Sequence, residues 1–225
     1  MPTNMSKYSQ MATRIARKPP ATSAEPRKPP HQARARATVN AILDATARIL
    51  AEDGFEAVNT NRVAEVAGVS VGSLYQYFPN KGSLVGAVAV RHTEAMATVL
   101  AGGVQAAADD DLPDLVKALI RSTMQAHAAN PKLRRAIIEE LPRIGRPARI
   151  AELKRGIHQS VVALLTARRS RIKVKDIPMA AFVIINTVQH LTHVAQAEGH
   201  DARDFARLER ELNDLVLSYL VGCGA

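Results

Sequence analysis

Residues 60–84, TNRVAEVAGVSVGSLYQYFPNKGSL, decide the fold of the N-terminal part of this chain. The hydroxyls of Thr60 and Ser70 can each cap a short helix by accepting from a first-turn N–H group. Gly68 can end the first helix because glycine readily takes a positive φ, and Pro79 ends the second. The two expected helices are residues 61–67 and 71–78, and this layout is typical of a helix-turn-helix.

Apolar residues in this segment follow the spacing of a packed helix pair. Ala64 is small where the two helices cross, and Leu74 reaches back toward the core. The spacing alone also suits an ordinary helical hairpin, but the caps at both helices favour the helix-turn-helix. Ala64 and Leu74 form, together with Val63, Val69 and Phe78, a set of apolar side chains that we call the apolar wedge.

The outer face of the second helix carries no charge, whereas a solvated helix normally presents Lys and Glu. Gly72 lets the backbone approach a phosphate, and Ser70 places a helix N-terminus there. Gln76 can read an adenine edge, Ser73 can contact either base type, and Lys81 offers a point charge to the backbone. The outward residues are Val71, Gly72, Ser73, Tyr75, Gln76 and Tyr77.

Residues 60–84 resemble the DNA-binding signature of the TetR family of bacterial transcriptional regulators, and the resemblance covers roughly residues 36–96. One departure is Gly82, where the family often has Glu. The resemblance implies a recognition helix at 71–78, a helix-turn-helix motif at 59–78, and backbone contacts from Thr60, Tyr75, Tyr77 and Lys81. The full set of expected DNA contacts is Arg34, Arg36, Thr60, Asn61, Arg62, Ser70, Val71, Gly72, Ser73, Tyr75, Gln76, Tyr77 and Lys81.

The rest of the chain also has helical periodicity, with no β-alternation and no internal repeat. Only 4% of the 225 residues are aromatic, so the core must consist of Ala, Val, Leu and Ile, which suits packed helices. Asn80 can cap a long helix that runs to about residue 107. We therefore predict an all-α protein of about nine helices. The remaining expected helices are 38–52, 113–129, 132–141, 148–169, 177–198 and 202–221, with breaks at 130–131, 142–147, 178 and 199.

Three regions follow from these patterns. Residues 1–33 are rich in proline and basic residues and read as a flexible arm. Residues 36–96 form the expected DNA-binding domain. Residues 97–221 form the expected helical domain for effector binding and dimerisation.

The net charge of +9 is unevenly distributed and suggests a polyanion partner, either nucleic acid or an anionic membrane. Residues 1–37 carry eight basic residues and one acid, whereas residues 38–90 carry three basic residues and five acids. A second basic cluster, with thirteen basic residues and three acids, lies at residues 132–175; it can attract an anionic effector, contact DNA or simply be a solvated surface.

Several classes of protein are disfavoured. No apolar stretch approaches the roughly 18 residues of a membrane span, and no signal-peptide run is visible. A single cysteine, Cys223, excludes an intrachain disulfide, so we expect a cytoplasmic protein. No nucleophile, base and orienting residue occur at a recognisable spacing, so we expect neither an enzyme nor a cofactor.

The helical body offers candidates for an interface and a pocket. The resemblance implies a homodimer formed by the last two helices, whose apolar stripes can equally close a monomer core. Methionines suit an adaptable apolar pocket, although each can also be ordinary core. His190 and His193 have a spacing that can hold a metal, but no Cys or carboxylate accompanies them, so we expect no metal site. The interface candidates are Ile184, Ile185, Val188, Leu191, Phe205, Leu208, Leu212, Leu215 and Tyr219, and the pocket candidates are Met96, Met124, His127 and Met179.

The expected function is that of a ligand-responsive dimeric repressor. It would bind a palindromic operator in double-stranded DNA and be released by a largely apolar small molecule. The alternative is a ligand-independent architectural DNA-binding protein, for which a long helical body is unnecessary.

Deleting residues 1–33 tests the role of the basic arm. We expect weaker DNA binding and a shallower dependence of affinity on salt, because fewer counterions are released when the arm is absent. Arg34 and Arg36 remain in this variant. The alternative is a leader that makes no contact, and it predicts an unchanged salt slope in a titration of binding against ionic strength.

Overall fold

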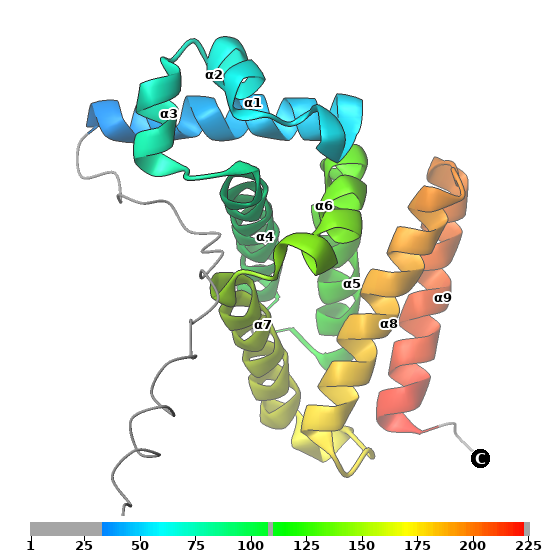
Figure 1. Ribbon diagram of the computed structural model, residues 1–225. Helices are drawn as coiled ribbons and strands as arrows, with labels where there is room; N and C mark the ends of the chain where they lie inside the picture. Colours follow the sequence, from blue (N-terminus) through cyan, green and yellow to red (C-terminus); the bar gives the residue numbers. More distant parts are fainter. Residues whose placement is uncertain (1–32, 108–109, 223–225) are drawn as a thin grey trace, which may run out of the picture.

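The computed structural model describes residues 33–107 and 110–222, and within them it contains nine α-helices, one 3₁₀-helix and no strand (Figure 1). The prediction of an all-α protein of about nine helices is confirmed. The predicted arm lies outside the described residues except for Ala33. The helices are α1 (Ala33–Ala57), α2 (Thr60–Ala67), α3 (Val71–Tyr77), α4 (Lys81–Ala106), α5 (Leu112–Ala128), α6 (Pro131–Ile144), α7 (Ala148–Ala167), η1 (Arg169–Arg171), α8 (Ile177–Ala197) and α9 (Ala202–Val221).

Side-chain caps set several of these helix starts. The Ser70 hydroxyl accepts from the Ser73 N–H at 3.0 Å, as predicted for α3. Asn80 accepts from the Ser83 N–H at 2.8 Å, and the Ser83 hydroxyl accepts from the Asn80 N–H at 3.2 Å. This reciprocal capping box anchors the start of α4 even though Gly82 replaces the glutamate common in the family.

Two predicted helix starts are wrong. Asn59, not Thr60, caps α2, because the Asn59 side-chain oxygen accepts from the Arg62 N–H at 2.9 Å and brings Thr60 into the first turn. The first helix begins at Ala33 rather than at residue 38. Arg34 and Arg36 therefore lie in the first turn of α1 and not in a segment before it.

The predicted break at Pro142 is also wrong. Helix α6 continues through this proline to Ile144 and ends at Gly145, whose φ is +82°. Leu141 and Ile144, on either side of the proline, pack against the apolar core formed by α1–α4. Tertiary packing of this last turn outweighs the local preference of proline to end a helix.

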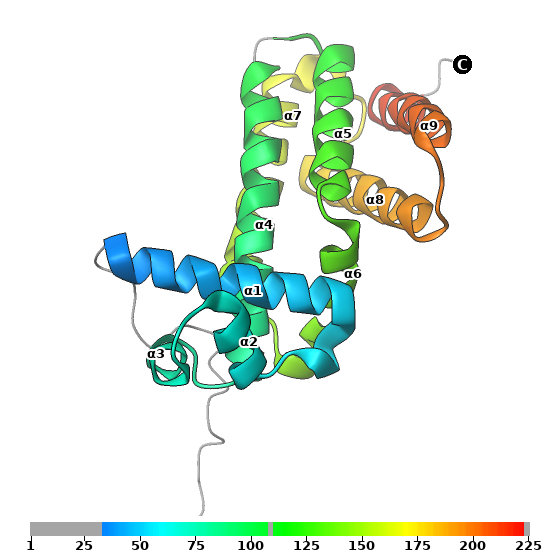
Figure 2. The ribbon, with the colours of Figure 1, turned by 90° about the horizontal axis from the view of Figure 1, so that it is seen from above.

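The apolar side chains form two clusters. The first joins α1, α2, α3 and the N-terminal half of α4, and it also includes Leu133, Ile137 and Ile150 from α6 and α7. The second joins α5, α7, α8 and α9. Helix α4 contacts α1 and α6 near its start and α5 and α7 farther along, so it joins the first cluster to two helices of the second. Figure 2 shows α1–α3 gathered at one end of this long helix, with α8 and α9 at the side of the body.

Helices α4 and α8 are long and apolar enough to cross a membrane by length and composition alone. The expectation that no stretch approaches such a length is therefore wrong for these two helices, because apolar residues interrupted by a few polar ones still reach a mean hydropathy of 1.2. Both helices pack against neighbours on several sides, α4 on α5 and α7, and α8 on α5, α7 and α9. Core helices of globular proteins have the same composition.

Helices α4 and α5 approach closely at Gly103. A Cβ atom built at Gly103 would lie 2.7 Å from the Ser122 Cβ and still closer to the Ser122 hydroxyl. At the adjacent Gly102, no atom lies within 4 Å of such a Cβ. Glycine at position 103 therefore permits the packing of the connecting helix on the body.

The two glycines form a matched pair for a stability test. We expect Gly103→Ala to lower the free energy of unfolding by about 1–3 kcal/mol through overpacking against Ser122. Gly102→Ala should raise it by about 0.5–1 kcal/mol because alanine favours the helix. Chemical denaturation of both variants checks this, and equal stabilisation by the two alanines would contradict the close approach.

Candidate nucleic-acid interface

The turn between α2 and α3 is held by backbone hydrogen bonds and by the core beneath it. Gly68 has a φ of +65°, which is the left-handed conformation predicted for it. The Val69 N–H donates to the Ala64 carbonyl at 3.0 Å and the Gly68 N–H donates to the Glu65 carbonyl at 3.1 Å. The side chains of the predicted wedge that are fully buried in the first cluster are Val63, Ala64, Leu74 and Phe78.

With Leu74 and Phe78 buried, the opposite face of α3 is turned to solvent. Val71, Gly72, Tyr75 and Gln76 are exposed. Ser73 is half-buried and its hydroxyl lies 2.8 Å from that of Ser70. The structure thus presents a small, uncharged surface on α3.

Tyr77 differs from the other residues predicted to face outward. It is half-buried and packs against the first apolar cluster. Its ring contributes to the core of helices α1–α3, which we call the head. The direction of the Tyr77 side chain was not evident from sequence because Tyr77 immediately precedes the buried Phe78.

Two hydroxyls predicted to contact the DNA backbone lie together. The Thr60 hydroxyl at the start of α2 and the Tyr75 hydroxyl on α3 are 3.1 Å apart. Asn61 is exposed in the next position of α2. The short distance joins the N-terminal end of α2 to the exposed face of α3 and makes them one surface.

The two basic side chains of this unit pair with carboxylates at the C-terminal end of α1. The Arg62 guanidinium lies 2.6 Å from the Asp53 carboxylate. The Lys81 ammonium lies 3.5 Å from the Glu56 carboxylate and 3.8 Å from the centroid of the Phe55 ring. Exposed ion pairs are worth only about 0–1 kcal/mol, so a phosphate can compete for either cation.

Arg34 and Arg36 lie on exposed positions of the first turn of α1. In both ribbon views α3 lies beside the N-terminal half of α1 (Figures 1 and 2). The two arginines therefore project from the end of the molecule that also carries α3.

A cavity of about 510 Å³, partly open to solvent, lies between the helices of the C-terminal part. Its wall consists largely of apolar side chains from α4, α5, α7, α8 and α9. None of the four residues predicted for a pocket is among the residues that line it. Met124 and His127 are buried beside it, Met96 is half-buried, and Met179 is 54% exposed.

Three residues predicted for the dimer interface instead line this cavity: Ile184, Ile185 and Val188. The alanine- and glycine-rich composition of α4 was the one available signal, since Ala97 and Ala101 leave space at the wall. Sequence alone did not say which helix faces that space.

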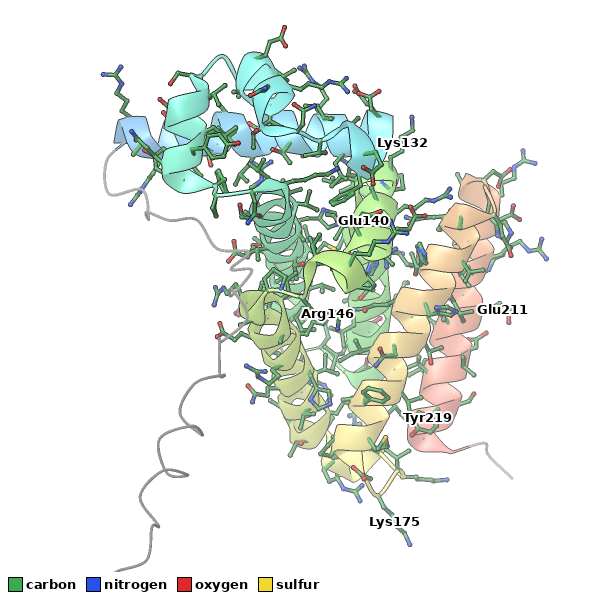
Figure 3. All side chains as sticks on the ribbon, in the orientation of Figure 1. Lys132, Glu140, Arg146, Lys175, Glu211 and Tyr219 are labelled. Carbon is green, nitrogen blue, oxygen red and sulfur yellow. The ribbon has the colours of Figure 1, made fainter. Side chains whose placement is uncertain are left out.

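The remaining interface candidates on α8 and α9 divide into exposed and packed residues. Leu191, Leu215 and Tyr219 are exposed, and Tyr219 is marked near the C-terminal end of α9 in Figure 3. Leu212 is buried, and Phe205 and Leu208 pack against the second cluster. Large apolar side chains that sequence reasoning did not assign to this surface are also exposed on α8: Met179, Phe182 and Val183.

The histidine pair gives no sign of a metal site. Within the described ranges, no three His, Cys, Asp or Glu side chains lie close enough to hold a metal ion. His193 instead places its Nδ1 3.0 Å from the Arg134 guanidinium.

A helix-turn-helix with an uncharged outer face, joined by one long helix to an all-helical body with a cavity, defines the architecture of a one-component regulator. Residues 42–88 match the family model for bacterial regulatory proteins of the TetR family, and residues 111–220 match that for the tetracyclin repressor-like C-terminal domain. The chain belongs to the TetR family of bacterial regulatory proteins.

Individual relatives agree with this assignment. The HTH-type transcriptional repressor KstR of Mycolicibacterium smegmatis is 54% identical over 44 residues, which span 20% of this chain and 22% of the relative. The match therefore covers only about a fifth of either protein. The relative whose name gives it as a helix-turn-helix transcriptional repressor therefore shares only a short segment with this chain.

Solved structures are similar over nearly the whole described chain. The fatty acid degradation regulator FadR from Bacillus halodurans has a TM-score of 0.63 at 23% identity, covering 80% of this chain and 94% of that one. A bacterial regulatory protein of the TetR family from Rhodococcus RHA1 has a TM-score of 0.65 at 20% identity, covering 84% and 98%. At these identities the likeness establishes the fold.

Proposed function

We propose that this chain is a cytoplasmic, non-enzymatic transcriptional repressor that binds a palindromic operator as a homodimer and is released when a small molecule fills the cavity. The observation that carries the proposal is the exposed, uncharged face of α3 above a buried Leu74, which is 0% exposed. Such a face suits base edges in the major groove better than bulk water.

The proposed roles follow the predicted domains. Residues 36–96 bind DNA, and residues 97–221 bind the effector and form the dimer. Val71 and Gln76 are the exposed α3 side chains to which we assign contacts with base edges. We assign contacts with the DNA backbone to the Thr60–Tyr75 hydroxyl pair and to Arg62 and Lys81 once these cations leave their ion pairs. The remaining proposed contacts are Arg34, Arg36, Asn61, Ser70, Gly72, Ser73 and Tyr77.

The proposed dimer surface is the exposed apolar face of α8 and α9. One helix-turn-helix reads only a few base pairs, so a two-fold dimer on two half-sites is needed for specificity. An apolar face of this kind on a single chain is typical of an interface. The residues that carry it are Met179, Phe182, Val183, Leu191, Leu215 and Tyr219.

Helix α4 supplies the proposed route from effector to DNA. Its N-terminal half lies in the apolar core of the head through Leu84, Val85 and Val88, while Leu100 and Val104 farther along line the cavity. A ligand that pushes on the second half of this helix therefore moves the head. In a dimer such movement changes the distance between the two recognition helices and weakens operator binding.

A footprint on promoter DNA tests the proposed function. We expect one short palindromic protected region of fixed length. Coverage that grows with the length of the DNA would contradict a specific regulator and favour an architectural protein.

Gln76→Ala tests the exposed face of α3 that we propose reads the bases. We expect a loss of about 1–3 kcal/mol in operator affinity and relaxed preference at one position of each half-site, because the amide no longer meets a base edge. Gln159→Ala, at an exposed position of α7, is the matched control and should bind as the unmodified chain does. Binding to operators with single base changes provides the measurement.

Phe182→Glu tests the dimer surface. Phe182 is 55% exposed in the single chain, so the substitution should leave the fold intact but place a charge in the interface. We expect a monomer in sedimentation velocity and a loss of operator binding. Val99→Glu is the control, since Val99 is also exposed but lies on α4; a Phe182→Glu protein that stays dimeric would refute this surface.

A further inference from the structure

Four basic side chains from four helices meet between the head and the cavity, and we call them the junction cluster: His92 on α4, His127 on α5, Arg134 on α6 and His193 on α8. The Arg134 guanidinium and the His193 Nδ1 are 3.0 Å apart. His127 is 2% exposed, and its pKa is influenced by the other three members.

The junction cluster contains buried polar atoms with no partner. Both ring nitrogens of His127 and the Nε2 of His92 are buried without a hydrogen bond among the described residues. A buried polar group left unsatisfied costs about 1–3 kcal/mol, and native proteins rarely retain several together without a ligand or ion. These nitrogens can therefore accept a hydrogen-bonding partner from outside the chain, either ordered water or a ligand.

The charge of the junction cluster says which kind of partner fits. In residues 33–107 and 110–222, no ion pair joins Arg134 to a carboxylate, and burial lowers the pKa of this guanidinium. Burial first, and then the charges of Arg134, His92 and His193, lower the pKa of His127 to about 3. The pKa of His193 is lowered by burial and by Arg134, His190 and Arg135. The lowered pKa values leave the three rings uncharged at neutral pH, so the Arg134 guanidinium supplies the positive charge of the site, which favours an anion.

The cavity wall also contains an arginine, Arg149, but two carboxylates already compensate the charge of this side chain. The Arg149 Nε donates to Glu94 at 3.1 Å and its Nη1 donates to Glu152 at 3.3 Å. In the part of the chain that the structure describes, Arg134 has no such carboxylates. An acidic ligand is therefore attracted to the junction cluster rather than to the arginine of the cavity wall.

The junction cluster adjoins the cavity on three shared helices. Each histidine lies four or five residues from a cavity-lining residue, a rise of about 6–7.5 Å along a helix. Helix α4 runs away from the head while α5 and α8 run toward it, so all three histidines lie at the end of the cavity nearer the head (Figure 1). The pairs are His92 and Ala97, His127 and Thr123, and His193 and Gln189.

We propose that the junction cluster binds the anionic head group of the effector whose apolar body occupies the cavity. The effector is then an amphipathic acid, with a carboxylate or phosphate at one end. This inference rests on the proposed function only in taking the cavity as the effector site. Arg134 supplies the charge and the histidine rings supply N–H donors to the acid.

This position also links the head group to the DNA-binding end. Leu133 and Ile137, on the same helix as Arg134, belong to the apolar core of the head, and α6 packs directly on α1. An anion that draws Arg134 toward the cavity therefore pulls on a helix that contacts the head. The apolar body of the same ligand acts on α4.

Two probes of equal chain length test the proposal: dodecanoate and its uncharged amide, dodecanamide. Isothermal titration calorimetry with the full chain should show about tenfold or tighter binding of the acid, as expected for charge-assisted hydrogen bonds in a buried site. Arg134→Gln should remove this preference while leaving the affinity for dodecanamide unchanged. Dodecyl phosphate, compared with dodecanoate, tells whether phosphate or carboxylate is the better head group.

Arg135→Gln is the matched control, because Arg135 is the next residue of α6 but is exposed and paired with Glu139 at 2.9 Å. It should retain the preference for the acid. His127→Gln keeps a polar side chain without the ring and should reduce the preference, which guards against a folding defect in the arginine variant. Equal affinity for acid and amide, or a preference that survives both Arg134→Gln and His127→Gln, would overturn the proposal.

A footprint of the unliganded chain separates this proposal from the function on which it rests. A protected palindrome together with equal affinity for acid and amide refutes the anion site alone. A missing palindrome refutes the proposed repressor, whatever the probes show.

Discussion

The packing of α4 on the first apolar cluster at one end and on α5 and α7 at the other is the constraint on which the rest of the structure depends. Leu84, Val85 and Val88 are almost completely buried in the head, and the C-terminal half of the same helix packs on α5 at Gly103. Because an α-helix is stiff over 26 residues, a displacement at one end is carried to the other. Helix α4 thus links the cavity wall to the core beneath the exposed face of α3, and α6 packs beside α4.

The electrostatics of the molecule follow the same division. The head presents an uncharged α3 and holds Arg62 and Lys81 in weak, exposed ion pairs. The junction between head and body instead holds Arg134 with no carboxylate partner among the residues that the structure describes, beside histidines with unsatisfied nitrogens. Arg134 is half-buried, so leaving its charge without a carboxylate costs free energy, which is the physical basis of the anionic ligand that we propose.

Local signals in the sequence predicted most of the helix boundaries. Ser70, Asn80 and Gly68 act through side chains or dihedral angles within three or four residues, and all three behave as expected. The errors arose where another residue competed or where packing intervened. Asn59 caps α2 in place of Thr60, and the contacts of Leu141 and Ile144 with the head carry α6 past Pro142.

By itself, the sequence determined the all-α class, most of the helix positions and the uncharged α3 face apart from Tyr77, because periodicity, caps and turn glycines are local properties. Only the tertiary structure decided what each apolar stripe packs against. Ile184, Ile185 and Val188 line the cavity while Met179 is exposed, because helical periodicity marks an apolar face without naming its neighbour. The junction cluster likewise exists only in the folded chain, since its four members come from four helices and span residues 92–193.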